Sequence, residues 1–468
     1  MAAMHELTAR QLAAAYAAGE ISPLEALRSA LARIASWEPR VNAMYRVSEA
    51  TALAEARAAE ARWRAGKPLS PIDGVPVTVK ENIATRGDPA PIGTRANEDT
   101  PPQPADAPPA ARLREAGCVI LGKTTMPDYG MLSSGVSSLH GITRNPWRLD
   151  RNTSGSSSGA GAACVAGYAP LHLGTDIGGS VRLPAAHCGI FALKPSLGRV
   201  PVHPPYLGRV TGPMTRTVDD AALLMNAIAR PDARDFMSLP PEEIDFSLER
   251  APRPLRIALL PDMGVGLNVQ PEVRAAVDAA AKALAGAGCT VESIRSFLTE
   301  EMLDGMCRFF EARSYNDFAQ LPAARRAKVL PFIAEWCSWR AARFTGQEVM
   351  QAYQQVMAMR EAAVAAIAPY DFILSPTSPI LAYEAELPAP GNDPRDALPH
   401  IAFTVPWNMS EQPAASVNWS WSADGLPIGV QVIGKRFDDA GVLRLVRRIE
   451  KIRPRQRPYP ATPSSSAD

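Results

Sequence analysis

One lysine and two serines have neighbours that could make them chemically reactive. Lys80 ends the segment VPVTVK, whereas Ser156 and Ser180 lie in the glycine-rich segments NTSGSSSGAG and GTDIGGSVRLPAA. A serine hydroxyl is a weak nucleophile until a base removes its proton. A lysine amine can be that base only where burial or a nearby cation keeps it neutral. These residue types could therefore form a nucleophilic site that needs no histidine.

The elements around these residues must bring them together. The segment from Gly74 to Lys80 alternates valines with a proline and a threonine, which predicts a strand that ends at the lysine, at the edge of a sheet. Taken alone, such a lysine is more often a surface residue. Gly178 and Gly179 lack Cβ atoms, so the chain before Ser180 can turn sharply and point successive N–H groups at one spot. That spot would hold an oxyanion.

A glycine-rich turn before a helix can also bind phosphate. Neither GxGxxG after a strand nor GxxxxGK[ST] occurs in a suitable setting, which argues against a nucleotide site.

The stretch from Arg151 to Ser196 strongly resembles the amidase signature family of serine hydrolases. In that family the nucleophile lies in a GGS turn, twenty-four positions after a bridging serine, and Ser180 follows Ser156 by 24 positions. Other segments typical of the family are DGVPVTVKENI, HGITRNPW, FALKPSLGRV, GPMTRTVDDAALL, DFILSPTSP and ADGLPIGVQVIG. The resemblance covers the chain from about residue 5 to about residue 455.

The resemblance implies a Ser-cisSer-Lys triad. Ser180 would be the nucleophile, and Ser156, in a cis peptide, would pass its proton to neutral Lys80 and later return it to the leaving amine. Ser154 and Ser158 stand where the family usually has glycines in a GGSSGG pattern. We expect these departures to change the shape of the loop without removing a reacting group.

The resemblance also assigns residues around the triad. The oxyanion would be bound by the main-chain N–H groups of Ile177, Gly178, Gly179 and Ser180. A carbonyl near Gly130 would accept a hydrogen bond from the substrate or the nucleophile loop. Three side chains would have supporting roles. Ser157 would assist the proton relay, and Thr175 and Asp176 would brace the loop before Ser180 by hydrogen bonds to its backbone.

Other hydrolytic sites have little support. A Ser-His-Asp triad needs a histidine near the nucleophile, but the chain has only six histidines, no G-x-S-x-G pattern around Ser180, and a His187 that we interpret as structural. No HExxH, HxH or CxxC pattern occurs, so we expect neither a metal nor an organic cofactor. The six cysteines are widely spaced and predict free thiols in a reducing compartment.

The composition is typical of a soluble enzyme. The 468 residues are 46% hydrophobic and 21% charged, with a net charge of +1, which argues against nucleic acid as a partner. The first thirty residues have helical spacing interrupted by charges and predict neither a signal peptide nor a membrane span. We expect a cytoplasmic protein that acts on a small-molecule amide, with its oligomeric state, including a homodimer, left open.

Strands that alternate with helices predict an α/β fold. We expect helices to about residue 66, a catalytic core over about 71–225, a helix-rich insertion over about 270–370, and a last helix near 438–451. The resemblance implies a single amidase signature domain over 1–455, with a large twisted mixed sheet and helices on both faces. A Pro- and Ser-rich tail over 456–468 is predicted to be disordered.

Substrate choice is less well defined by the sequence. The eight aromatic residues between 309 and 344 include Phe332, Trp336 and Trp339 on one helical face, which predicts core packing. If others line the entrance, the pocket would be broad, apolar and suited to aryl or alkyl groups. Trp407, Trp419 and Trp421 are further candidates, because that region approaches the pocket in the family.

The prediction is an amidase that hydrolyses C–N bonds of small alkyl or aryl amides or anilides, with esters and carbamates also open, through an acyl-enzyme on Ser180. One alternative is the glutaminase subunit of a tRNA-dependent amidotransferase, against which Leu183 counts, because such subunits usually have glutamine there. The other is a non-catalytic binding protein of the same fold, which the retention of Lys80, Ser156 and Ser180 disfavours.

Overall fold

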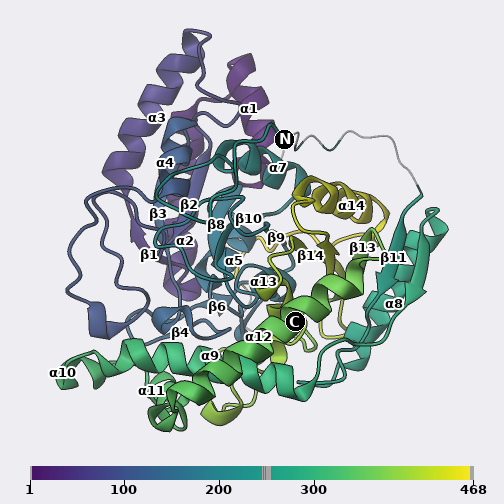
Figure 1. Cartoon of the computed structure of the whole chain (residues 1–468). Helices are drawn as coiled ribbons and strands as arrows, with labels where there is room; N and C mark the ends of the chain where they lie inside the picture. The colour runs from purple at the N-terminus through teal and green to yellow at the C-terminus, as the bar shows by residue number, and fades with distance from the viewer. Residues whose placement is uncertain (1–2, 245, 247, 249–253, 464–468) are drawn as a thin grey trace.

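The strand segments of the chain join into one mixed sheet of eleven strands, in the order β1-β3-β2-β8-β10-β9-β14-β15-β13-β11-β12 (Figure 1). The computed structural model describes residues 3–244, 246, 248 and 254–463. The strands are β1 Met44–Val47, β2 Pro76–Lys80, β3 Val119–Thr124, β8 Leu171–Asp176, β9 Phe191–Lys194, β10 Val210–Thr215, β11 Arg256–Leu259, β12 Thr290–Ser293, β13 Phe372–Pro376, β14 Ala414–Trp421 and β15 Pro427–Gly434.

Helices cover both faces of this sheet, as predicted. They are α1 Ala9–Ala18, α2 Pro23–Val41, α3 Glu49–Arg64, α4 Pro108–Glu115, α5 Ser158–Ala166, α6 Arg182–Cys188, α7 Val218–Ile228, α8 Pro271–Gly286, α9 Glu300–Ala319, α10 Ala323–Arg326, α11 Pro331–Ser338, α12 Gly346–Ile367, α13 Val405–Met409 and α14 Asp439–Ile452. Two short hairpins, β4 Val136–Ser137 with β5 Gly141–Ile142 and β6 Arg144–Asn145 with β7 Arg148–Asn152, lie outside the main sheet.

Alternating side chains of the strands divide the core into two layers. Phe372 and Leu374 of β13 belong to the same hydrophobic cluster as buried residues of α1, α4, α7, α8 and α14, whereas Ile373 between them belongs to the cluster that includes α9, α11, α12 and α13. In β3, Ile120 belongs to the first layer, and the residues on either side of it pack with α2 and α5. This period of two is expected of a strand that is buried on both faces.

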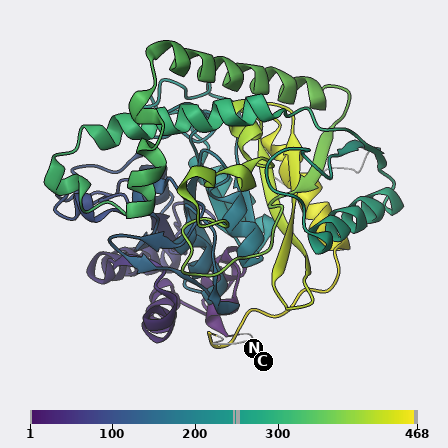
Figure 2. The same ribbon diagram turned by 90° about the horizontal axis from the view of Figure 1, so that it is seen from below.

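The helix-rich insertion has two parts. Helix α8 packs on the sheet beside β13 and β15, whereas α9, α11 and α12 pack on one another and on α13. Figure 2 shows α9 and α12, in green, lying side by side across one side of the molecule. The insertion therefore covers the part of the sheet that includes β13.

Two departures from the predicted organisation concern the ends of the chain. The N-terminal segment is not purely helical, because β1 lies between α2 and α3 and pairs antiparallel with β3. The predicted disordered tail over 456–468 also differs from the structure, because residues 456–463 pack on the body of the protein. Residues 464–468 lie outside the described residues.

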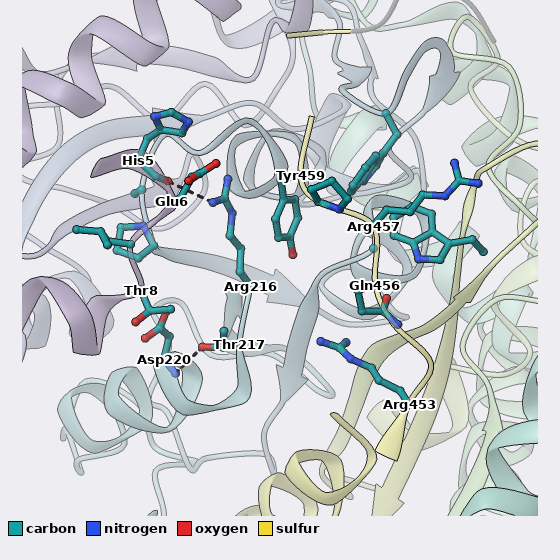
Figure 3. Close-up of a pocket in the computed structure, with 17 residues that line it drawn as sticks. His5, Glu6, Thr8, Arg216, Thr217, Asp220, Arg453, Gln456, Arg457 and Tyr459 are labelled. Atoms are coloured by element: carbon teal, nitrogen blue, oxygen red, sulfur yellow. Dashed lines mark hydrogen bonds between the residues drawn. The ribbon is translucent and has the colours of Figure 1, made fainter. Parts of the chain in front are cut away.

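Aromatic and cationic contacts hold this C-terminal segment in place. The Tyr459 ring lies 5.7 Å from the ring of Trp147 and 4.2 Å from the Arg216 guanidinium carbon, at one side of a pocket (Figure 3). Arg33 donates hydrogen bonds to the carbonyls of Pro460 and Ala461, at 3.1 and 3.0 Å. Stacking of this kind fixes a chain segment that has no regular secondary structure.

Parallel strands set the position of the reactive residues. Strand β2 is internal to the sheet and pairs in parallel with β8, with Val79 opposite Leu173. The carboxyl ends of the two strands therefore meet at the same edge, where Lys80 ends β2 and Asp176 ends β8. Crevices at this end of parallel strands are where α/β proteins commonly bind ligands.

The described part of the chain has no helix that is both long enough and apolar enough to cross a bilayer. All six cysteines are free thiols, as predicted.

Candidate active site

Lys80 is fully buried and contacts one of the two predicted serines. Its Nζ lies 2.8 Å from Ser156 Oγ and 3.0 Å from Thr175 Oγ1. Burial lowers the pKa of Lys80 to about 7, although the negative charge of Asp176 opposes this shift. The positive charge of Arg209 also lowers it. A neutral amine can accept the Ser156 proton with its lone pair while one of its N–H groups donates to Thr175.

The loop that carries Ser156 has a cis peptide between Gly155 and Ser156, as the resemblance implies. A Cβ added to Gly155 would lie 2.5 Å from the carbonyl oxygen of Ser134, so the loop packs too closely for a larger residue. Gly130 lies on the other side, because a Cβ added to it would be 3.2 Å from Ser156 Oγ. Gly130 therefore lies close to Ser156, and the predicted role of a nearby carbonyl as a hydrogen-bond acceptor stays a prediction.

Ser180 lies against the same loop. Its carbonyl accepts a hydrogen bond of 3.1 Å from the N–H of Ser157, the residue after Ser156. Ser157 Oγ in turn donates to the carbonyl of Thr175 at 3.2 Å and accepts from the Thr175 N–H at 3.3 Å. Ser157 thus joins the start of α5 to the end of β8, and its predicted part in a proton relay stays a prediction.

The Asp176 side chain binds the turn before Ser180. Its carboxylate accepts five hydrogen bonds, from Gly179 N–H at 2.9 Å, Val181 N–H at 3.1 Å, Arg182 Nε and Nη2 at 3.0 Å each, and Asn408 Nδ2 at 2.8 Å. Burial opposes ionisation, but the Arg182 guanidinium more than offsets it and lowers the pKa of Asp176. Both side chains are completely shielded from solvent.

Sequence reasoning missed Arg182 and its partners. Besides Asp176, the Arg182 guanidinium donates to Thr404 O at 2.9 Å, Gln431 Oε1 at 2.8 Å and Asn408 Oδ1 at 2.6 Å. The segment SVRLPAA places an arginine in the first turn of a helix beside the nucleophile. A cation in that position needs buried hydrogen-bond acceptors. The arginine next to the nucleophile could therefore have predicted a buried hydrogen-bond network around it.

The oxyanion donors differ from the prediction at Gly179, whose N–H already donates to Asp176. In the described chain, the N–H groups of Ile177, Gly178 and Ser180 have no protein acceptor. Thr404 Oγ1 donates to the carbonyl of Gly178 at 2.6 Å and so fixes the orientation of the peptide that follows Gly178. The turn therefore offers three main-chain donors in place of four.

Apolar side chains cover the turn. A Cβ added to Gly178 would lie 3.3 Å from Ile401 Cδ1 and 3.7 Å from Phe310 Cε2. Phe310 comes from α9, within the predicted aromatic segment, and Ile401 lies just before α13. Val405 Cγ2 is the next atom, at 4.0 Å, so the three nearest contacts of the first glycine are apolar.

Three of the tryptophan candidates pack in the core, and a fourth contacts the C-terminal segment, whereas Phe332 and Trp339, also predicted to pack in the core, are only half-buried. Trp336 and Trp407 are 2% and 0% exposed within the layer under α9 and α12, and Trp419 is buried on the opposite face. Trp421 contacts Trp147 edge to face, with ring centroids 4.6 Å apart and ring planes at 69°, and both line the pocket of Figure 3.

Two more polar residues after Lys80 were not predicted. Asn82 Nδ2 donates to Thr175 Oγ1 at 3.1 Å, and Glu81 Oε2 lies 2.7 Å from His140 Nε2. Both belong to the KENI segment that begins at Lys80. Asn82 thus binds the hydroxyl that contacts the Lys80 amine, and Glu81 binds a histidine beside the same segment.

In the described residues no three His, Cys, Asp or Glu side chains are grouped so that they could hold a metal ion. The expectation of a cofactor-free site stays a prediction.

Known proteins resemble this chain over almost its whole length. The family model described as Amidase matches residues 25–443. The A subunit of the glutamyl-tRNA(Gln) amidotransferase of Myxococcus xanthus (strain DK1622) is 36% identical in an alignment 479 positions long that covers 95% of this chain and 97% of that protein. An acylamidase of Rhodococcus erythropolis is 32% identical in an alignment 466 positions long that covers 96% of each chain.

A solved structure gives the same result for the fold. A bacterial aryl acylamidase, described as belonging to the amidase signature enzymes, superposes with a TM-score of 0.87 and 28% identity. The match covers 95% of this chain and 96% of that chain.

The Asp176 network predicts a large effect on stability. Asp176→Asn should lower the free energy of unfolding by about 3–5 kcal/mol, because Arg182 would remain buried without a counter-charge. Denaturant unfolding measures this change. Asp150→Asn is the matched control, since Asp150 pairs with Arg148 at 2.7 Å but its side chain is 46% exposed, and it should cost less than about 1 kcal/mol. Equal losses in the two variants would contradict the role of the buried pair.

Proposed function

The chain belongs to the amidase family, and on that basis we propose that it hydrolyses carboxamides through an acyl-enzyme on Ser180. The observation that carries the proposal is the 2.8 Å contact between buried Lys80 Nζ and Ser156 Oγ, beside the turn that holds Ser180. A base with a pKa near neutrality, a hydroxyl relay and free N–H donors are the parts that acyl transfer requires.

The first half of the reaction forms the acyl-enzyme. Ser180 Oγ attacks the amide carbonyl carbon while its proton moves to Ser156 Oγ and the Ser156 proton moves to Lys80 Nζ. The oxyanion of the tetrahedral intermediate accepts hydrogen bonds from the N–H groups of Ile177, Gly178 and Ser180. Lys80 then returns a proton through Ser156 to the leaving nitrogen, the C–N bond breaks, and an ester remains on Ser180.

The second half releases the acid. Water attacks the ester carbonyl and gives its proton to the same relay, and Ser180 regains its proton as the C–O bond breaks. Thr175 contributes by position, since its hydroxyl oxygen accepts from Lys80 Nζ at 3.0 Å and leaves the lone pair directed at Ser156. Asn82 holds that hydroxyl from the other side.

The names of the relatives support two kinds of substrate. The acylamidase and the aryl acylamidase favour simple acyl amides and anilides. The amidotransferase subunits, at 34–36% identity, favour a glutaminase that works with partners, and Leu183 counts against this alternative. We retain the simple amidase as the proposal. Its cytoplasmic location, its assembly state and its independence of nucleic acid stay predictions.

The nucleophile can be tested by covalent labelling. A fluorophosphonate probe should label the native enzyme once and leave Ser180→Ala unlabelled, as judged by intact-mass spectrometry. The variant should also lose at least about 10³-fold in kcat/KM. Ser158→Ala is the control from the other serine loop, because its hydroxyl only contacts the Thr125 carbonyl at 3.5 Å, and it should label normally. Full labelling of Ser180→Ala would place the nucleophile elsewhere.

The base can be tested by the pH dependence of kcat/KM. Protonated Lys80 cannot accept a proton, and its pKa is lowered to about 7, so the rate should rise with pH through neutrality and then level off. At pH 6 it should be about one-tenth of the plateau. A profile that stays level down to pH 5 would contradict Lys80 as the base.

A further inference from the structure

Two arginines lie beside the oxyanion turn. Arg209 immediately precedes β10, whose first residue Val210 pairs with Asp176, so Arg209 is next to the turn that starts at Ile177. Arg313 lies in α9, one helical turn after Phe310, and Phe310 covers Gly178. The two cations therefore approach the turn from the sheet on one side and from the insertion on the other.

Both guanidinium groups lie against the ring of Tyr206. The carbon Cζ of Arg313 lies 4.9 Å from the ring centroid of Tyr206, and that of Arg209 lies 5.7 Å from the same centroid. Arg313 is also 5.3 Å from the ring of Phe310. Burial, and the like charge of Arg313, lower the pKa of Arg209. Two half-buried positive charges thus lie against the same ring, near enough for the charge of Arg313 to act on Arg209.

Neither arginine has a carboxylate partner within 4.0 Å in the described part of the chain. Elsewhere on α9, Arg308 pairs with Asp304 at 2.6 Å, and Glu311 pairs with Arg340 at 2.6 Å. Asp317, one turn beyond Arg313, is exposed and makes no ion pair within 4.0 Å with either arginine in the described part of the chain, although its negative charge raises the pKa of Arg209 and so opposes part of the lowering. Arg209 donates instead to a neutral acceptor, the Pro204 carbonyl, at 3.3 Å.

We propose that Arg209 and Arg313 bind a carboxylate of the substrate, so that the enzyme prefers amides that carry an anionic group. A guanidinium group matches a carboxylate with paired N–H donors, and a carboxylate between the two arginines would relieve their mutual repulsion. Phe310 and Ile401 would contact the carbon chain between this group and the reacting carbonyl. The inference rests on the proposed function, because the turn that holds Ser180 defines the site.

This inference changes the expectation from the sequence. From the sequence, the aromatic segment predicts core packing, with a broad apolar pocket for aryl or alkyl groups as the alternative if some of its side chains line the entrance. The structure brings Arg313 from that same segment next to Arg209, a residue more than a hundred positions earlier in the chain. The combination of an apolar wall and two cations fits a substrate with an apolar chain and an acidic end.

Matched substrates test the preference. The p-nitroanilides of butyric acid and of succinic acid have the same chain on the acyl side, which ends in a methyl group in the first and in a carboxylate in the second. N-acetyl-4-methylaniline and 4-acetamidobenzoate make the same comparison on the amine side. The native enzyme should favour the carboxylate in at least one pair by about tenfold or more in kcat/KM, and Arg313→Gln should remove that preference through KM. Arg308→Gln, from the same helix, should keep it.

A binding measurement separates this inference from the proposed function. Calorimetry with the Ser180→Ala variant needs no turnover, and it uses the carboxylate compound, succinic p-nitroanilide or 4-acetamidobenzoate, that the native enzyme prefers. Adding Arg313→Gln or Arg209→Gln should weaken its binding by about tenfold or more. Equal affinity with and without the arginines, or a native preference for the neutral member of both pairs, would overturn the inference. Tight, arginine-dependent binding with no hydrolysis of any amide would instead contradict the proposed function.

Discussion

The burial of one amine at the end of an internal strand is the constraint on which the rest of the site depends. Lys80 is shielded from water, so its nitrogen needs partners from the protein, and Ser156 and Thr175 supply them. Removal from water also disfavours its charge, which is why its pKa falls to about 7. The parallel pairing of β2 with β8 brings the amine to the edge where the Ser180 turn follows β8 and where Ser156, from the loop before α5, contacts it.

A second buried charge keeps those loops in shape. Asp176 ends β8 and binds Arg182 at the start of α6. Arg182 also donates hydrogen bonds to Thr404, just before α13, and to Asn408 within α13. The turn with the oxyanion donors is therefore tied to the segment that carries Ile401. Catalytic groups from the sheet and covering groups from the C-terminal half of the chain are positioned by one network.

Sequence reasoning found the parts of the site that local pattern encodes. The strand before Lys80, the spacing of the serines and the glycine turn each depend on a few neighbouring residues, and the mixed sheet with helices on both faces followed from the resemblance. It missed the hydrogen bonds of Arg182, the use of the Gly179 N–H by Asp176, and the packing of Tyr459. Each depends on side-chain geometry or on contacts such as Arg182 with Asn408, which join residues far apart in the chain.

The charge state of Lys80 tests the account most directly. Heteronuclear NMR of protein with isotope-labelled lysine side chains can follow each amine through a titration, and the Lys80→Met variant identifies the Lys80 signal by its loss. The account predicts a midpoint at about 7 for that signal. A midpoint near the ordinary lysine value of 10.5 would mean that the amine is charged at neutral pH, and it would contradict the central claim.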